Sequence, residues 1–216
     1  MTTEELLKRI DHTLLTPIAT WEQIRTVCED GMRFHTAGVC IPPRFVERAH
    51  KEFPDLRLCT VIGFPTGFHT TYMKCAEADE AIENGAVELD MVISLGALKQ
   101  GQYTVVEEEI RAMRDMCDRQ VLKVIIETCL LTEDEKKRMC EIVSAAKADY
   151  IKTSTGFSSG GATEADVALM RQYCDPTVKI KAAGGISTIE QAEKLIACGA
   201  DRIGTSRIVN IIKEML

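Results

Sequence analysis

Residues 121–154 read VLKVIIETCLLTEDEKKRMCEIVSAAKADYIKTS, and this stretch decides the fold that we expect. It begins with a β-rich run at 121–128, continues as a helix-like segment at 132–147, and ends with a second β-rich run at 149–154. Thr132-Glu-Asp-Glu135 has the spacing of a capping box, a side-chain arrangement that starts many helices. The stretch is therefore typical of a strand, a helix and a further strand joined by short loops.

The same alternation extends over the whole chain. We expect strands at 9–14, 34–40, 57–63, 86–93, 121–128, 149–154, 178–182 and 201–204. We expect helices near 20–31, 43–51, 70–84, 103–119, 132–147, 163–173, 187–198 and 206–215. Helix signals include the start at Thr163-Glu-Ala-Asp166 and glycine stops at Gly31, Gly85 and Gly199. Eight strands alternating with eight helices predict an α/β fold of the (β/α)₈ TIM-barrel type, with about 27 of the 216 residues in each unit.

An open, doubly wound sheet is the alternative architecture. Such a sheet usually has a glycine-rich turn after its first strand. Here Asp11-His-Thr-Leu-Leu15 occupies that place, and no GxGxxG motif occurs, which favours the barrel. No linker or low-complexity tract divides the chain, so we expect one domain over residues 1–216.

Composition and charge exclude several classes of function. A net charge of −7 and an aromatic content of 5% argue against a nucleic-acid partner. The start of the chain lacks the basic and apolar regions of a signal peptide, and no apolar run approaches the roughly 18 residues of a membrane span. We therefore expect a cytoplasmic protein. Nine cysteines without a CxxC pair predict neither a disulfide framework nor structural zinc, and no metal motif links the histidines, which are His12, His35, His50 and His69.

Several of the expected strands carry charges in the middle, where barrel strands are normally apolar. Because side chains alternate along a strand, we expect the following charges to point into the barrel: Glu88, Asp90, Lys123, Glu127, Lys152 and Lys181. A single charge in a strand usually lies at its end or edge, which is our interpretation of Lys179. Adjacent strands that all carry buried charge are harder to explain structurally, because isolated buried charges cost several kcal/mol. The pattern therefore predicts a catalytic cluster.

The lysines give this chemistry a direction. An unperturbed lysine has a pKa of about 10.4 and is about 0.04% neutral at pH 7. A second ammonium about 4 Å away, at an effective dielectric near 20, contributes about 4 kcal/mol and lowers that pKa by about three. One buried ammonium can thus turn its neighbour into an amine nucleophile, which attacks a carbonyl to form a Schiff base. A carboxylate such as Asp90 could move protons in these steps.

At this point the sequence resembles a known family, the class I 2-deoxyribose-5-phosphate aldolases. The likeness runs nearly end to end, and four of its segments are specific in their order and spacing. These segments are Leu122-Lys-Val-Ile-Ile-Glu-Thr128, Tyr150-Ile-Lys-Thr-Ser-Thr-Gly156, Lys181-Ala-Ala-Gly-Gly-Ile186 and Arg202-Ile-Gly-Thr-Ser206. The resemblance implies reversible cleavage of 2-deoxy-D-ribose 5-phosphate to D-glyceraldehyde 3-phosphate and acetaldehyde through a lysine Schiff base, with neither a metal nor a cofactor.

The resemblance also implies roles for individual residues. Lys152 matches the Schiff-base lysine, Lys181 matches the second lysine that favours the unprotonated amine of the first, and Asp90 matches the proton-relay carboxylate. A surrounding polar wall is implied at Asp11, Cys40 and Lys123. Asp11 is expected to position Lys123 or an ordered water. Cys40 is not assigned as a nucleophile, because the carbonyl chemistry requires an amine.

The phosphate end of the site follows from barrel architecture. Barrel enzymes often bind phosphate on the loops after the seventh and eighth strands, where glycines allow the backbone to approach an anion. The predicted phosphate-binding residues are Gly156, Gly184, Gly185, Ile186, Gly204 and Ser206, with Ser206 at the start of the last helix. The alternative is that these glycines only make tight turns. The predicted partner is a small-molecule sugar phosphate, and the sequence is compatible with a homo-oligomer without specifying one.

Two departures from the family pattern stand out. Arg207 follows Ser206 where the family often has a second small residue, and it either reinforces phosphate binding or caps the cavity. The sequence ends at Leu216 without the terminal tyrosine tail of some members, so we expect proton transfer without such a tail or through water.

Three rival functions stay open: a transaldolase-like lysine enzyme, a phosphate-binding isomerase or synthase using carboxylate acid–base chemistry, and a non-catalytic sugar-phosphate binder or regulatory subunit.

Overall fold

Eight parallel strands close into a barrel within residues 1–215, the part of the chain that the computed structural model describes. The strands are β1 Ile10–Thr13, β2 Gly38–Cys40, β3 Leu58–Ile62, β4 Glu88–Val92, β5 Val121–Ile125, β6 Tyr150–Lys152, β7 Lys179–Ala183 and β8 Arg202–Thr205. Each strand pairs with the next, and β8 closes the ring by pairing with β1, where Gly204 lies opposite Asp11. The predicted (β/α)₈ barrel is confirmed, and the open doubly wound alternative is wrong.

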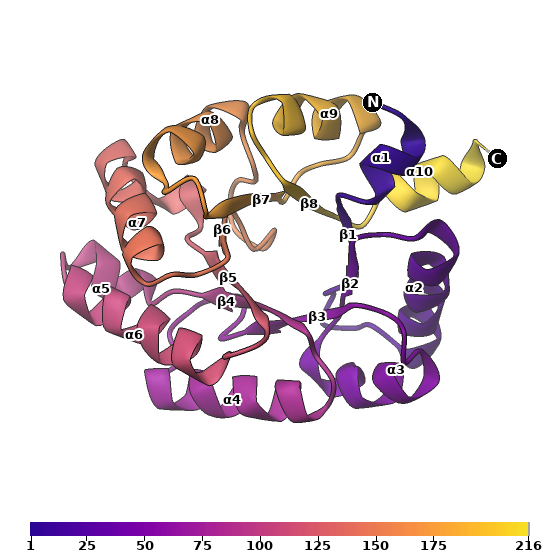
Figure 1. The fold of residues 1–216 in the computed structure, drawn as a ribbon, viewed down its shortest axis with the longest axis horizontal. Coiled ribbons are helices and arrows are strands. Elements are labelled where there is room, and N and C mark those ends of the chain that lie inside the picture. Colours follow the sequence, from indigo (N-terminus) through magenta and orange to yellow (C-terminus); the bar gives the residue numbers. More distant parts are fainter. Residues whose placement is uncertain (216) are drawn as a thin grey trace.

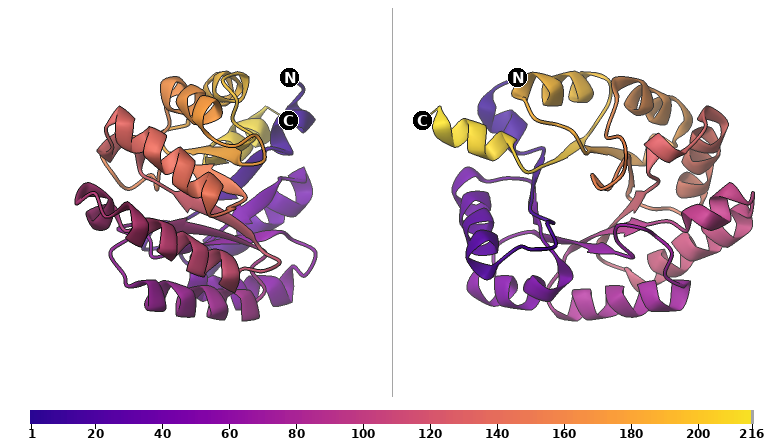
Figure 2. Two further views of the ribbon diagram at one scale, coloured as in Figure 1. Left: turned by 60° about the vertical axis from the view of Figure 1, so that its left-hand side comes forward. Right: turned by 180° about the vertical axis from the view of Figure 1, so that it is seen from behind.

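Helices surround the ring of strands on its outside, and both chain ends lie on the same side of the barrel (Figures 1 and 2). The α-helices are α1 Thr3–Leu7, α2 Trp21–Phe34, α3 Val46–Glu52, α4 Thr71–Glu83, α5 Leu95–Lys99, α6 Tyr103–Met116, α7 Glu133–Ala145, α8 Glu164–Tyr173, α9 Ile189–Ala197 and α10 Ile208–Glu214. Two 3₁₀ turns are η1 Pro43–Phe45 and η2 Thr128–Leu130. None of the helices in residues 1–215 combines the length and the apolar character needed to cross a bilayer.

Most of the predicted helix signals have their expected effect. Thr132 and Glu135 form the predicted capping box at the start of α7, and the Thr163 side chain accepts from the Asp166 backbone N–H at the start of α8. Gly85 and Gly199 follow α4 and α9 with φ of +103° and +115°, a conformation that favours glycine.

Gly31 is different, because it does not end a helix. Helix α2 continues to Phe34, and His35 caps it in the left-handed conformation. A Cβ on Gly31 would lie 2.3 Å from the Val39 side chain, so this glycine allows α2 to pack closely on β2. The strand predicted at 34–40 is consequently only Gly38–Cys40.

Further differences concern short elements and element ends. Helices α1 and α5 were not predicted, since each has only five residues and shows no clear periodicity. Helix α10 begins at Ile208, so Ser206 precedes it rather than starting it. Glu127, expected on the inner face beside Lys123, lies beyond the end of β5 with φ of +54°. Leu216 lies outside the described residues.

The apolar core lies between the strands and the helices, not inside the barrel. Outward-facing strand residues such as Leu89, Val124, Ile151 and Ile180 belong to one large cluster of buried apolar side chains. The inner face carries a small separate cluster of buried apolar side chains, which consists of Cys40, Cys59 and Val61. Much of the remaining inner face carries buried charged side chains.

One buried ion pair lies in the outer layer. The Lys74 ammonium on α4 donates to Glu109 Oε1 on α6 at 2.6 Å and to the Val92 carbonyl at 2.8 Å. The other Glu109 oxygen accepts from the Ser94 N–H at 2.9 Å. Burial lowers the pKa of Lys74 and raises the pKa of Glu109, and each partner opposes the shift of the other. The pair ties two helices to the end of β4.

We predict that Glu109→Ala lowers the free energy of unfolding by about 3–5 kcal/mol, because it leaves a buried ammonium without its counter-ion. Urea denaturation followed by circular dichroism measures this change. The double variant Lys74→Met/Glu109→Leu should recover much of the loss, since it removes both charges from the same place. A single variant as stable as the parent would contradict the structural role of the pair.

Candidate active site

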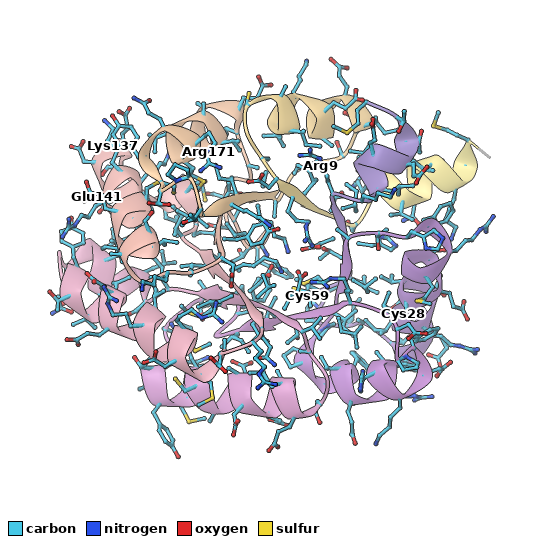
Figure 3. The ribbon with its side chains drawn as sticks, viewed as in Figure 1. Arg9, Cys28, Cys59, Lys137, Glu141 and Arg171 are labelled. Carbon is cyan, nitrogen blue, oxygen red and sulfur yellow. The ribbon has the colours of Figure 1, made fainter. Side chains whose placement is uncertain are left out.

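The barrel interior contains seven charged side chains that contact one another. This core charge cluster comprises Asp11, Glu88, Asp90, Lys123, Lys152, Lys181 and Arg202. They come from six strands whose inward positions alternate with the outward apolar ones. Cys59, labelled in Figure 3, lies among them in the middle of the ring of strands. The strand pattern therefore does bring the predicted lysines and carboxylates together.

Asp90 occupies the centre of this cluster. Its Oδ2 atom lies 2.6 Å from Lys152 Nζ and 2.7 Å from Lys181 Nζ, and its Oδ1 atom lies 2.8 Å from Lys123 Nζ. Burial alone would raise the pKa of Asp90, but the three ammonium groups outweigh it and hold this pKa well below its usual range. Asp90 is thus a carboxylate that bridges three lysines.

The other two carboxylates of the cluster, Asp11 and Glu88, contact the lysines that do not line the cavity. Asp11 Oδ2 contacts Lys181 Nζ at 2.5 Å, and Glu88 Oε2 contacts Lys123 Nζ at 2.7 Å. Against the effect of burial, neighbouring cations lower the pKa of both Asp11 and Glu88. Burial would lower the pKa of Lys181, but Asp11 and Asp90 raise it above the usual value for lysine. Lys181 is therefore held as an ammonium.

Lys152 differs from the other lysines in two ways. It contacts a single carboxylate, whereas Lys181 contacts two and Lys123 contacts three. It is also the lysine that lines the main cavity in the described part of the chain, whereas Lys123 and Lys181 are fully buried beneath it. Among these three amines, Lys152 is the one that a small molecule can reach.

The cavity has a volume of about 600 Å³ and opens where β1, β6, β7 and β8 end. Its walls include most of the predicted site residues that do not belong to the charge cluster: Gly156, Gly184, Gly185, Ile186, Gly204 and Ser206. Within residues 1–215, the ionisable side chains that line it are Lys152 and Arg207, both basic. A cavity of this kind suits a small ligand with an anionic group.

The glycines in the loops around the cavity have different structural roles. A Cβ on Gly161 would lie 2.2 Å from the Gly184 carbonyl oxygen, and a Cβ on Gly184 would lie 3.1 Å from the Gly161 Cα. The loops after β6 and β7 therefore touch through their backbones. Gly185, with φ of +75°, has nothing within 4 Å of an added Cβ, so its backbone faces open space.

Sequence reasoning missed part of the cavity wall. Residues such as Leu14, Leu15, Thr155 and Phe157 line it without carrying any charge that could identify them. It also misplaced Glu127, which accepts hydrogen bonds from the Thr155 N–H at 3.2 Å and from the Thr155 hydroxyl at 2.5 Å. Glu127 thereby supports the wall instead of joining the lysine cluster. Lys179 lies exposed at the start of β7, as predicted.

Two overlapping sets of side chains offer ligand atoms close enough for a metal: Cys40, Cys59 and Asp90, and Asp11, Cys59 and Glu88. Ammonium groups already occupy their coordination space, because Lys123 Nζ lies 3.2 Å from Cys59 Sγ and 2.8 Å from Asp90 Oδ1. Burial raises the pKa of Cys59, which disfavours the thiolate that a metal would need. These donor sets fit internal ion pairing better than metal binding.

Comparison with known proteins agrees with this geometry. The model of the DeoC/LacD family aldolases matches residues 6–211. A deoxyribose-phosphate aldolase of Clostridium botulinum is 49% identical over 214 residues, which cover 99% of this chain and 97% of the relative. One of Streptococcus agalactiae is 51% identical over 215 residues, covering 99% and 96%. The solved tetrameric deoxyribose phosphate aldolase of Aeropyrum pernix superposes with a TM-score of 0.91 at 29% identity, covering 100% and 94%. This chain therefore belongs to the DeoC/LacD family of aldolases, and these full-length relatives are deoxyribose-phosphate aldolases.

Proposed function

We propose that this protein cleaves 2-deoxy-D-ribose 5-phosphate reversibly to D-glyceraldehyde 3-phosphate and acetaldehyde, through a Schiff base on Lys152. The observation that carries the proposal is the position of Lys152. Its amine lines the cavity, and it rests on one carboxylate that it shares with two other lysines. The substrate is that of the relatives, and the covalent chemistry is that of an amine beside a fixed ammonium.

The reaction begins when the Lys152 amine attacks the C1 aldehyde of the open-chain sugar. Loss of water gives a protonated imine, which attracts electrons. The C3 hydroxyl loses its proton, the C2–C3 bond breaks, and its electron pair moves toward the imine to form an enamine. D-Glyceraldehyde 3-phosphate leaves. Protonation of the enamine at C2 and hydrolysis of the imine then release acetaldehyde and regenerate Lys152.

Asp90 and Lys181 assist this sequence. Asp90 Oδ2 lies 2.6 Å from Lys152 Nζ, close enough to take the lysine proton and to return protons during imine formation and hydrolysis. Lys181 touches the same oxygen at 2.7 Å and remains positive. Its charge opposes a second positive charge on Lys152 and so favours the free amine. Asp11 and Lys123 hold Lys181 and Asp90 in place, and Cys40 lies behind them without lining the cavity.

The phosphate binds at the other end of the cavity, where the loops after β7 and β8 meet. Gly185 offers unobstructed backbone, and Ser206 and Arg207 line the same wall. Lys152 at the carbonyl end and the Arg207 guanidinium at the phosphate end match a substrate that has its reactive carbon and its phosphate at opposite ends. A carboxylate-based isomerase would need an acidic lining residue, and the described lining contains none.

Assembly into a homo-oligomer is part of the proposal. The structurally similar aldolase of Aeropyrum pernix is a tetramer. In this chain Phe68, Tyr72 and Met73 expose 74%, 79% and 55% of their surface near the start of α4. Large apolar side chains exposed so close together are typical of surfaces that contact another protein.

We predict that borohydride, added with acetaldehyde or substrate, attaches the reduced carbon skeleton to Lys152. Mass spectrometry of the digested protein locates the label. Lys152→Ala should abolish it, whereas Lys179→Ala, which removes an exposed lysine of the same barrel, should leave it intact. Labelling of Lys123 or Lys181 in the parent would show that the roles are assigned wrongly.

We predict that exhaustive chelation leaves the rate of aldol cleavage unchanged, because the amine chemistry requires no metal. The measurement is acetaldehyde release from 2-deoxyribose 5-phosphate before and after treatment. A loss of activity that zinc or manganese restores would instead indicate a metal-dependent aldolase.

We predict that Ser206→Asp lowers kcat/KM for the phosphorylated sugar several-fold to a hundredfold, about 1–3 kcal/mol, because a carboxylate in the cavity wall repels the phosphate. Activity on unphosphorylated 2-deoxyribose should change far less. Ser158→Asp, which adds the same charge to an exposed serine outside the cavity lining, is the matched control. Equal loss with both sugars would show that the phosphate binds elsewhere.

A further inference from the structure

Like Glu88, Arg202 belongs to the core charge cluster but has no role in the reaction described above. It lies on β8, and its side chain is 12% exposed. Its Nη1 atom lies 2.5 Å from Asp11 Oδ1 and 3.3 Å from Glu88 Oε2, and its Nη2 atom lies 3.4 Å from the Tyr150 hydroxyl. A guanidinium so placed in a barrel interior requires an explanation.

Two chains of ion pairs connect Arg202 with Asp90, the carboxylate that holds Lys152. One passes through Asp11 and Lys181, and the other passes through Glu88 and Lys123. The strand register places the cations in one row, because Lys152 is the partner of Lys181 on β7, and Lys181 is the partner of Arg202 on β8. Arg202 therefore shares Asp11 with Lys181 and Glu88 with Lys123, at the opposite end of the cluster from Lys152.

The charges in this cluster do not balance. Among residues 1–215 it contains four cations and three carboxylates, so full ionisation leaves one positive charge in excess. Loss of one proton removes the excess, and buried clusters are more stable when their charges balance. Arginine does not lose its proton in proteins. Lys152 has the fewest carboxylate contacts of the three lysines, so its ammonium is the one that the carboxylates stabilise least.

We propose that Arg202 is a positioning residue whose permanent charge, acting through Asp11 and Glu88, keeps Lys152 in its amine form. The inference rests on the proposed role of Lys152 as the nucleophile. Without the guanidinium, three lysines would face three carboxylates, and the cluster would be neutral with Lys152 protonated.

The other ionisable groups near Arg202 are Arg57, Tyr150 and Lys179. Arg57 binds the second oxygen of Glu88 at 2.9 Å, but its side chain is 57% exposed, so water screens its charge. Tyr150 lies beneath the Arg202 guanidinium and also faces the Lys179 ammonium, 5.7 Å from its ring. Two thiols also lie beside the carboxylates: burial raises the pKa of Cys59, and a hydrogen bond with Cys59 lowers the pKa of Cys40.

The size of the effect follows from Coulomb's law. Lys152 and Arg202 lie two strand spacings apart, which is roughly 10 Å. At an effective dielectric near 20, one charge at that distance changes the pH midpoint of an amine by about one pH unit. The amount of free amine at pH 7 then changes about tenfold.

The experiment measures the initial rate of borohydride trapping with acetaldehyde as a function of pH, together with the pH profile of kcat/KM. Arg202→Gln should raise the midpoint of both profiles by about one pH unit, lower trapping at pH 7 about tenfold, and leave the high-pH plateau near that of the parent. Arg202→Lys should keep the parental midpoint. Arg57→Gln, the matched control, should produce a clearly smaller shift.

Glu88→Gln provides the opposite test, because it removes a negative charge and should lower the midpoint. The double variant Arg202→Gln/Glu88→Gln should return it close to the parental value. An unshifted midpoint in Arg202→Gln, equal loss at every pH, or shifts of the same sign in both single variants would overturn the proposal. If Arg202→Gln does not fold, the Glu88→Gln variant tests the proposal alone: a lowered midpoint supports it, and an unchanged or raised midpoint overturns it. Absence of trapping in the parent would contradict the Lys152 mechanism itself, so the two failures are distinguishable.

Discussion

The contact between Asp90 and three lysines is the interaction on which the rest of the site depends. A lone carboxylate or ammonium in the barrel interior would be far too costly to remain ionised, and each is stable only because the others surround it. Asp90 therefore performs two functions at once. It makes the buried lysines tolerable, and it fixes the position of Lys152, the amine that we propose as the nucleophile.

Much of this arrangement could be predicted from the sequence. The alternation of β-rich and helix-like segments predicted the barrel. The period-two spacing of strand residues placed Asp90, Lys152 and Lys181 on its inner face, where the structure has them. Residues after the last two strands were expected at the cavity, and they line it. These successes share a cause: strand register and strand order in a closed barrel follow directly from the pattern of the chain.

What the sequence could not provide depends on contacts between distant side chains. Glu127 fits the alternation of its strand, but the backbone turns at that residue and directs it to Thr155. Gly31 resembles a helix stop, and only the approach of Val39 reveals it as a packing position. Arg202 at the start of a strand resembles an ordinary edge charge, and its importance appears only when its partners from two other strands are known.

The separation of the apolar layer from the barrel interior has a consequence for how such an enzyme can diversify. The large core lies between strands and helices, whereas cavity-lining side chains such as Thr16, Phe157 and Arg207 lie outside it. Substitutions at these positions alter the shape and charge that a sugar meets, and they leave the packing that maintains the barrel untouched. New substrate preferences can therefore arise by substitution at the cavity rim, while the buried lysine cluster below is inherited unchanged.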